Sequence, residues 1–205
     1  MQNTNNEKKI TTVIFDCFNV LYTPPIFNWV KEHIGSNFLA DNSFRDLIVR
    51  YDLGEADENE YLEFLAENEG KGRSIPEVKK EIVGETALVE EVFSIAKKLK
   101  EDGYKIGLLS NGGQEFFDDY IFPVRTDFKE LFDSIVISSH VHMVKPDAAI
   151  YMYALNDIEA TAEEAVFIDD SLSNVEAAIA LGIHGILYTA PEKLIEDLKK
   201  YDIHI

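Results

Sequence analysis

One aspartate stands out in this chain because of the residues around it. The apolar run from Val13 to Phe15 ends at Asp16, and a short loop follows. In open α/β sheets, ligands bind at the carboxyl ends of the parallel strands. A carboxylate in that place can attack phosphorus or carbon and form a covalent intermediate. The side chain of Phe18, two residues further on, can neither donate nor accept a proton.

Three further predicted strand ends carry residues that suit the same chemistry. They supply two more carboxylates, a hydroxyl group beside a glycine turn, and a lysine. Because the carboxyl ends of parallel strands share one edge of the sheet, we expect these groups to converge on one cleft with Asp16. The residues are Ser110, Asn111, Gly112, Lys145, Asp169, Asp170 and Asn174.

Five short apolar runs predict the strands that position these groups. The runs are continuous rather than alternating, which is typical of a parallel sheet covered by helices on both faces. The predicted strands are Thr12–Asp16, Lys105–Ser110, Ser134–Ser138, Ala165–Asp169 and His184–Tyr188. Apolar residues at helical spacing and capping signals predict helices between them. These are Thr86–Lys100, a short helix after Thr161, Ser173–Leu181 and Glu192–Lys200.

The interval between the first two strands is far longer than one crossover helix requires. It contains four helical patterns, at Pro24–His33, Ser43–Tyr51, Asp57–Glu69 and Ser74–Val83. We therefore predict an α/β core of residues 1–23 and 85–205 with an inserted helical cap of residues 24–84. Because the insertion follows the Asp16 loop directly, it would lie over the site as a lid.

Composition limits the partners and the compartment. The 205 residues carry 19 Lys+Arg against 38 Asp+Glu, and the resulting net charge of −19 repels nucleic acid and anionic membranes. A phosphate site would therefore need local positive charge from a metal ion or a lysine. Cys17 is the one cysteine, which excludes an internal disulfide and fits a reducing compartment. Residues 1–9 read as a frayed polar tail without a signal-peptide core, and no apolar stretch reaches the ~20 residues of a membrane span. We expect a cytoplasmic protein with a small-molecule substrate and no nucleic-acid or membrane partner; the oligomeric state stays open.

Taken together and in this order, these motifs resemble the haloacid-dehalogenase-like superfamily of hydrolases. The resemblance covers the whole chain, and the Lys145-Pro146-Asp147 and Asp169-Asp170-Ser171 forms look like the branch with a small helical cap after the first motif. The resemblance implies a Rossmann-like parallel sheet in the order 5-4-1-2-3, with the Asp16 strand central. It also implies a magnesium-dependent phosphatase that acts on a small phosphorylated metabolite.

The resemblance assigns catalytic roles by position. Asp16 would attack phosphorus and form an aspartyl phosphate. Ser110, Asn111 and the amide of Gly112 would hold phosphate oxygens. Lys145 would also bind the phosphate, neutralise the developing charge and keep Asp16 ionised.

The resemblance also assigns a metal site. Mg²⁺, which prefers hard oxygen ligands, would be held by Asp16, the Phe18 carbonyl oxygen and the Asp169–Asp170 pair. Asp170 is expected to be the direct ligand of that pair, with Asp169 in support. Asn174 would orient this loop, a metal-bound water or the substrate.

Phe18 is the departure from the family pattern. Phosphatases of this superfamily usually carry a second Asp there, which protonates the leaving group and then activates water, and losing such a group costs ~10²–10⁴-fold in rate. Three alternatives follow. The leaving group needs little protonation, or its proton comes from water or the cap; the reaction is carbon–halogen hydrolysis, in which halide leaves without a proton; or the fold is kept for binding. Dehalogenases usually lack the tandem aspartates, so Asp169 and Asp170 favour metal-dependent phosphoryl chemistry.

Other residues near these motifs have simpler interpretations. His140 and His142 are better explained as solvated loop histidines than as metal ligands, and Cys17 as a small buried hydrophobe. Side chains of the cap are candidates for substrate contact or for the pocket wall. The candidates are Phe27, Trp29, Arg50 and Tyr51.

Overall fold

A five-stranded parallel sheet forms the centre of the molecule. The computed structural model describes residues 9–23, 25–123 and 125–205, so the predicted tail up to residue 8 and the predicted helix start at Pro24 lie outside the described residues. The strand order is β3-β2-β1-β4-β5, the predicted 5-4-1-2-3 read from the other edge, with every neighbouring pair parallel. The strands are β1 (Thr12–Phe15), β2 (Lys105–Ser110), β3 (Ser134–Ile137), β4 (Ala165–Asp169) and β5 (His184–Leu187). The fold is therefore α/β and Rossmann-like.

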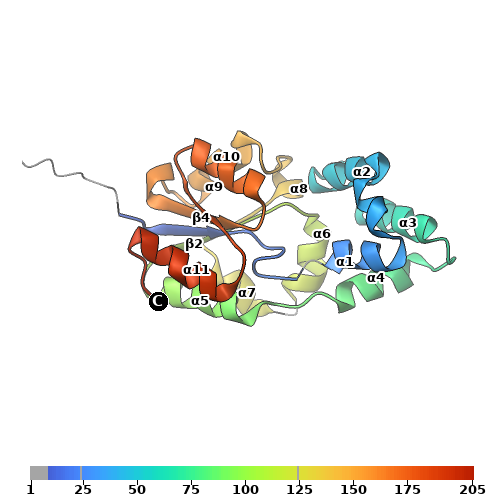
Figure 1. Ribbon diagram of the computed structural model, residues 1–205, viewed down its shortest axis with the longest axis horizontal. Coiled ribbons are helices and arrows are strands. Elements are labelled where there is room, and N and C mark those ends of the chain that lie inside the picture. Colours follow the sequence, from blue (N-terminus) through green and yellow to red (C-terminus); the bar gives the residue numbers. More distant parts are fainter. Residues whose placement is uncertain (1–8, 24, 124) are drawn as a thin grey trace, which may run out of the picture.

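Helices cover both faces of this sheet, α9 and α10 on one side and α5, α7 and α11 on the other (Figure 1). Their bounds are α5 (Glu90–Glu101), α7 (Thr126–Leu131), α9 (Ala148–Asp157), α10 (Leu172–Ala180) and α11 (Pro191–Leu198). Shorter elements connect them: α6 (Gln114–Phe116) with a π-helical turn at Phe117–Ile121, α8 (Ser138–Val141), and single 3₁₀ turns at Ala162–Glu164 and Lys199–Tyr201. The predicted short helix after Thr161 is present as the turn Ala162–Glu164 with its Thr161–Glu164 capping box, and the predictions of α10 and α11 were confirmed within two residues. The prediction missed α6, α7, α8 and α9.

The buried strands explain why the apolar runs are continuous. Val13 and Phe15 of β1 belong to the cluster under α5 and α11, whereas Ile14 belongs to the cluster under α9 and α10. Successive side chains of a strand point to opposite faces, so a strand covered on both sides must be apolar at every position. The strand begins with Thr12, and Asp16 is the first polar side chain after its apolar residues.

The inserted residues form four helices with a hydrophobic cluster of their own. They are α1 (Pro25–His33), α2 (Asn42–Asp52), α3 (Glu58–Glu69) and α4 (Ile75–Gly84), with a 3₁₀ turn at Ser36–Ala40. All four predicted helices are present with small shifts of their ends. The Asp57 carboxylate caps α3 by accepting the Glu60 N–H at 2.8 Å, and Ser74 and Glu77 form the predicted capping box of α4. Trp29, Phe44 and Leu65 are fully buried in the cluster between these helices.

The predicted helix Thr86–Lys100 was wrong over its first residues, because helix α5 begins only at Glu90. Residues 86–89 instead pair with the chain that leaves β1. The Thr23 N–H donates to the Ala87 carbonyl at 2.8 Å, and the Val89 N–H donates to the Leu21 carbonyl at 2.8 Å. These backbone bonds override the local helical pattern. They hold both ends of the insertion side by side, close to the carboxyl edge of the sheet.

A small set of close contacts seats the inserted helices on the core. The ring nitrogen Nδ1 of His142 lies 2.8 Å from the Leu53 carbonyl oxygen, which gives this histidine a positioning role. Gly54 has a φ of +72°, and a Cβ added there would lie 2.6 Å from the Ser139 carbonyl oxygen. The backbone after α2 therefore lies so close to α8 that position 54 has no room for a side chain.

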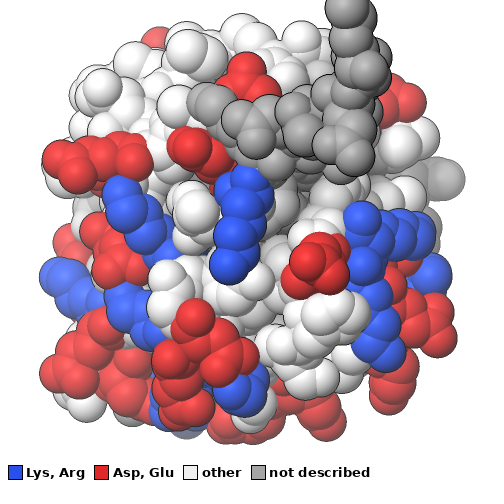
Figure 2. All heavy atoms as spheres, turned by 90° about the vertical axis from the view of Figure 1, so that its left-hand side faces the viewer, with Lys and Arg blue, Asp and Glu red and all other residues white. Residues whose placement is uncertain are grey.

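Figure 2 shows the end of the molecule away from α1 to α4, where acidic and basic side chains are interspersed. Ion pairs such as Lys97–Asp127 at 3.0 Å and Lys100–Asp133 at 2.5 Å use up much of the positive charge. Within the part of the chain that the structure describes, none of the helices is long and apolar enough to span a bilayer.

Gly54 offers a direct test of the contact between α2 and α8. We expect Gly54→Ala to lower the free energy of unfolding more than Gly70→Ala does. Both glycines have a φ near +70°, but a Cβ at Gly70 meets nothing within 4 Å. The positive φ costs each variant alike, and the clash with the Ser139 carbonyl adds about 1–3 kcal/mol in Gly54→Ala alone. Urea unfolding of the two variants measures the difference, and equal losses would contradict the contact.

Candidate active site

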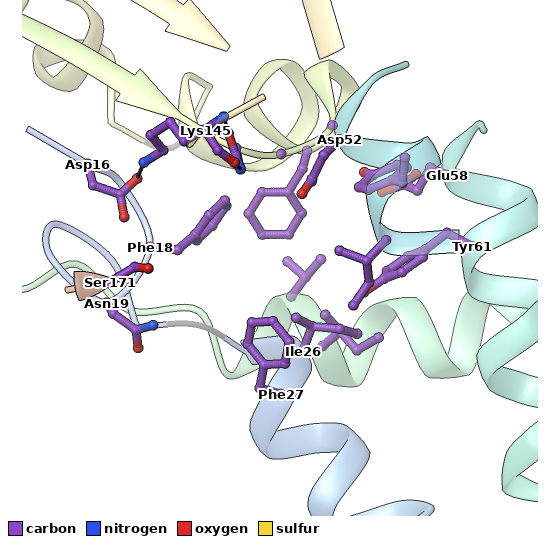
Figure 3. A pocket seen from close by; sticks show the side chains of 18 of the residues that line it. Asp16, Phe18, Asn19, Ile26, Phe27, Asp52, Glu58, Tyr61, Lys145 and Ser171 are labelled. Atoms are coloured by element: carbon purple, nitrogen blue, oxygen red, sulfur yellow. Dashed lines mark hydrogen bonds and ion pairs between the residues drawn. The ribbon is translucent and has the colours of Figure 1, made fainter. Parts of the chain in front are cut away.

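A pocket of about 370 Å³ lies between the carboxyl edge of the sheet and helices α1 to α4 (Figure 3). Its polar floor comes from the ends of β1, β2 and β4 and from the loop after α8. The inserted helices supply most of its other side. The predicted site residues on the floor are Asp16, Asn111, Gly112, Lys145, Asp170 and Asn174. Phe18 lies among the lining residues as well, so the structure brings together most of the residues singled out in the sequence.

Lys145 joins two strand ends through a buried ion-pair network. Its Nζ donates to Asp16 Oδ1 at 2.6 Å and to Asp169 Oδ2 at 2.7 Å. All three side chains are buried. Burial opposes the charge of Lys145, but the two carboxylates hold the Lys145 pKa above its ordinary value. Burial raises the pKa of Asp16, and the Lys145 ammonium acts against that rise by favouring the carboxylate.

Asp169 and Asp170 differ in what surrounds them. The Asp169 carboxylate accepts the Asn174 amide N–H at 3.1 Å and the Ser171 backbone N–H at 2.8 Å, in addition to Lys145. Its oxygens are thus committed within the protein. Asp170 is exposed. Partial burial of its carboxylate and, second in size, the negative charge of Asp169 raise the pKa of Asp170 above its ordinary value. Asp169 is built to organise the site, and Asp170 is open to a ligand.

Asp16, Asp169 and Asp170 each have one carboxylate oxygen that lies within 4.8 Å of those of the other two. One lysine faces these three acids, so the cluster keeps an excess of negative charge. Hard oxygen donors with solvent access at Asp170 are a donor set that Mg²⁺ accepts. The residues therefore fit a magnesium ion, whose positive charge would balance the cluster and admit a phosphate.

The end of β2 serves the lysine loop. The Asn111 amide donates to the Lys145 carbonyl at 3.0 Å, and its Oδ1 accepts the Lys145 backbone N–H at 2.9 Å. The Gly112 N–H donates to the Ser138 hydroxyl at 3.0 Å. Ser110 is fully buried, and its hydroxyl donates to the Asn111 carbonyl at 3.2 Å rather than lining the pocket. Asn111 thereby fixes the position of the Lys145 backbone. Phosphate binding by Ser110 and Gly112 stays a prediction.

Phe18 forms an apolar wall of the pocket that Asp16 also lines. Its ring packs edge-on against Phe116 at 5.6 Å and lies 5.8 Å from Phe117, measured between ring centroids. A Cβ at Gly112 would lie 3.1 Å from the Phe18 ring, so the glycine lets the ring pack closely against the end of β2. The side chain that replaces the usual acid is therefore fitted into the site rather than turned out of it.

The inserted helices contribute residues that the sequence indicated only in part. Phe27 and Tyr51 line the pocket as predicted, but Trp29 is buried in the cluster of the insertion and Arg50 pairs with Glu60 at 2.8 Å outside it. No sequence pattern indicated several other lining residues, because their direction depends on how the helices lie over the sheet. The missed residues include Ile26, Ile48, Asp52, Glu58, Lys79 and Ile82.

Several curated proteins are similar to this chain. Over 200 residues it is 28% identical to drimenol cyclase drtB of Aspergillus calidoustus, covering 92% of this chain and 36% of that protein. Over 96 residues it is 33% identical to sesquiterpene phosphatase astK of Aspergillus oryzae, covering 47% and 48%. Over 182 residues it is 30% identical to a phosphorylated carbohydrates phosphatase of Thermotoga maritima, covering 85% and 82%. The chain thus spans about a third of the cyclase and 23% of bifunctional epoxide hydrolase 2 of Rattus norvegicus.

Solved structures agree with the topology. A HAD family enzyme of Bacteroides thetaiotaomicron, in complex with magnesium and inorganic phosphate, superposes with a TM-score of 0.72 at 24% identity, covering 88% of this chain and 95% of that one. A dehalogenase superposes with a TM-score of 0.64 at 15% identity, covering 91% and 96%. At these identities the likeness shows the fold. The model of the haloacid dehalogenase-like hydrolases matches residues 10–182, and this chain belongs to that family.

Proposed function

We propose that this hydrolase is a magnesium-dependent phosphatase that removes phosphate from a small phosphorylated metabolite through a phosphoryl group on Asp16. The observation that carries the proposal is the bridge of Lys145 between Asp16 and Asp169, with Asp170 exposed beside it. Three carboxylates around one lysine make a site that needs a divalent cation before it can accept an anion. A halide-releasing enzyme has no such need, so the cluster favours phosphoryl transfer over carbon–halogen hydrolysis.

The residues divide the work in two steps. In the first, the Asp16 carboxylate attacks phosphorus, a bond forms between them, and the ester oxygen leaves with the bonding pair and takes up a proton. In the second, water attacks the phosphorus, inorganic phosphate is released, and the Asp16 carboxylate is restored. Lys145 keeps Asp16 ionised and stabilises negative charge on the transferred group.

A bound Mg²⁺ would be held by the carboxylates of Asp16 and Asp170 and the carbonyl of Phe18, and it would supply positive charge against the phosphate oxygens. Asp169 would hold Lys145 and the loop in place, with Asn174 steadying Asp169. As part of the same proposal, residues 24–84 are the cap that closes over this site. Its support is the separate hydrophobic cluster, drawn from residues 26–82.

The pocket walls supplied by the insertion indicate the organic part of the substrate. Ile26, Ile48 and Leu62 line the pocket beside Tyr51 and Tyr61. Among the described residues of the inserted helices, Lys79 is the one cation in this lining. Lys79 pairs with Glu58, and its Nζ lies 4.9 Å from the centroid of the Tyr120 ring. Most of the side chains in these walls are apolar or aromatic, and Asp52 and Glu58 add two carboxylates. The walls support a phosphate ester of a largely apolar alcohol, a substrate nearer in kind to that of the sesquiterpene phosphatase than to that of the carbohydrate phosphatase.

The reaction class is tested by phosphate release from para-nitrophenyl phosphate. We expect release that requires Mg²⁺, stops with a chelator, and is absent in Asp16→Asn, because the amide cannot act as the nucleophile. Halide release from a haloacid that persists in chelator would instead assign the site to dehalogenation. A protein with neither activity would contradict both and leave the binding alternative.

The metal site is tested by titration calorimetry with Mg²⁺. Asp170→Asn should weaken binding by about tenfold or more, because a neutral amide replaces a charged ligand. Since Asp170 is exposed, the unfolding midpoint should change little. Asp119→Asn, a change of the same kind at an exposed residue outside the pocket lining, is the matched control. Equal Mg²⁺ affinity in wild type and Asp170→Asn would remove Asp170 from the site.

The apolar character of the substrate is tested at Phe27, which lines the pocket and is 39% exposed, so its replacement should leave the fold intact. We expect Phe27→Ser to lower kcat/KM for octyl phosphate about tenfold while kcat/KM for glycerol phosphate stays the same. Val49→Ser on α2 is the control, because Val49 is 50% exposed and lies outside the lining. Equal effects on both substrates would contradict an apolar subsite.

A further inference from the structure

The Asp52 carboxylate is a polar group that the proposed reaction has not yet used. Asp52 is the last residue of α2 and lines the pocket with Asp16 and Lys145. Figure 3 shows its side chain directed into the pocket, with Phe18 between it and Asp16. Among the described residues no hydrogen bond or ion pair to this carboxylate is found, although nearly every other charged group near the pocket is paired. A carboxylate in that state is available to a ligand.

Phe18 cannot act as the acid that phosphatases of this family usually carry at position 18, and the location of Asp52 suits that role. In a phosphoryl transfer the attacking and leaving oxygens lie roughly in line with phosphorus. The leaving oxygen therefore departs on the side away from Asp16, toward the inserted helices. Asp52 lies on that side of the pocket (Figure 3).

We propose that Asp52 is the general acid of this enzyme and protonates the leaving alcohol oxygen in place of the missing acid at position 18. This inference rests on the proposed phosphatase function. As the bond between phosphorus and the ester oxygen breaks, that oxygen takes the Asp52 proton and leaves as the alcohol. In the second step the Asp52 carboxylate accepts a proton from the attacking water, which restores both Asp16 and Asp52. The cap would thus complete the catalytic set only when it lies over the core.

The surroundings of Asp52 keep the proton available. Burial raises the pKa of Asp52 to about 7, and the charge of Lys145 acts in the opposite direction. Tyr51 and Tyr61 line the same side, and burial raises the pKa of both phenols, so they stay neutral. The remaining charged groups on that side are Glu58 and Lys79, which form an ion pair. The negative charge of Glu115 also contributes to the raised pKa of Tyr51. An acid near neutral pH suits general acid catalysis.

The test compares two leaving groups in Asp52→Asn. With octyl phosphate, whose alkoxide is strongly basic, we expect kcat to fall by about 10²–10⁴-fold. With para-nitrophenyl phosphate, whose leaving group needs no proton, kcat should change little. Asp46→Asn, the same substitution at an exposed residue of α2 outside this pocket, should leave both rates unchanged. Circular dichroism and thermal unfolding of Asp52→Asn check that the fold is kept.

The pH profile separates an acid from a merely structural residue. An acid acts in its protonated form, so wild-type kcat for octyl phosphate should fall as pH rises past about 7. That limb should be absent in Asp52→Asn, and absent for para-nitrophenyl phosphate, which carries the same phosphate group. Equal losses on both substrates, or an alkaline limb that persists in Asp52→Asn, would overturn the role of Asp52 while leaving the phosphatase intact. Failure of the wild type to release phosphate from either ester would overturn the function and this inference together.

Discussion

The buried contact of Lys145 with Asp16 and Asp169 is the interaction on which the rest of the site depends. It crosses from the loop after α8 to the ends of β1 and β4, so it ties three separate chain segments at one edge of the sheet. Removing either type of partner would leave an uncompensated buried charge, which is strongly destabilising. The Asn111 side chain makes hydrogen bonds with both the backbone N–H and the backbone carbonyl of Lys145, and the Asn174 amide donates to the Asp169 carboxylate. The Asp16 carboxylate, the proposed nucleophile, is thus held in place by contacts within the protein.

The inserted helices supply most of the other side of the pocket. Backbone hydrogen bonds between residues 21–23 and 87–89 join both ends of the insertion, so these helices lie over Asp16 without interrupting the sheet. Its inner surface is mostly apolar, and Phe18 continues that surface into the core. The same substitution that removes the usual acid therefore extends the apolar wall. At the end of α2, the Asp52 carboxylate has no hydrogen-bond or ion-pair partner among the described residues, and the proposed acid role would compensate for that loss.

The sequence pattern was sufficient to predict the strands of the sheet and most of the residues on the pocket floor, and the family resemblance supplied the strand order. The reason is topological, since parallel strands bring their carboxyl ends to one edge whatever the details of packing. It was insufficient where long-range contacts decide. The pairing of residues 86–89 cancels a local helical pattern, and the bond of the Asn111 amide to the Lys145 backbone spans 34 residues without leaving a motif. The pocket-facing position of Asp52 depends on how α2 lies against the core, where Gly54 and His142 make close contacts that no local pattern predicts.

The central claim is that phosphorus becomes bonded to Asp16, and trapping that species tests it most directly. A single turnover of the wild-type enzyme with octyl phosphate and Mg²⁺ would be quenched in acid and the peptides analysed by mass spectrometry. The account predicts one added phosphoryl group on the peptide that contains Asp16, and none when a chelator is present. A turnover that leaves this peptide unmodified, places phosphate on another residue, or attaches the organic part to Asp16 would contradict it.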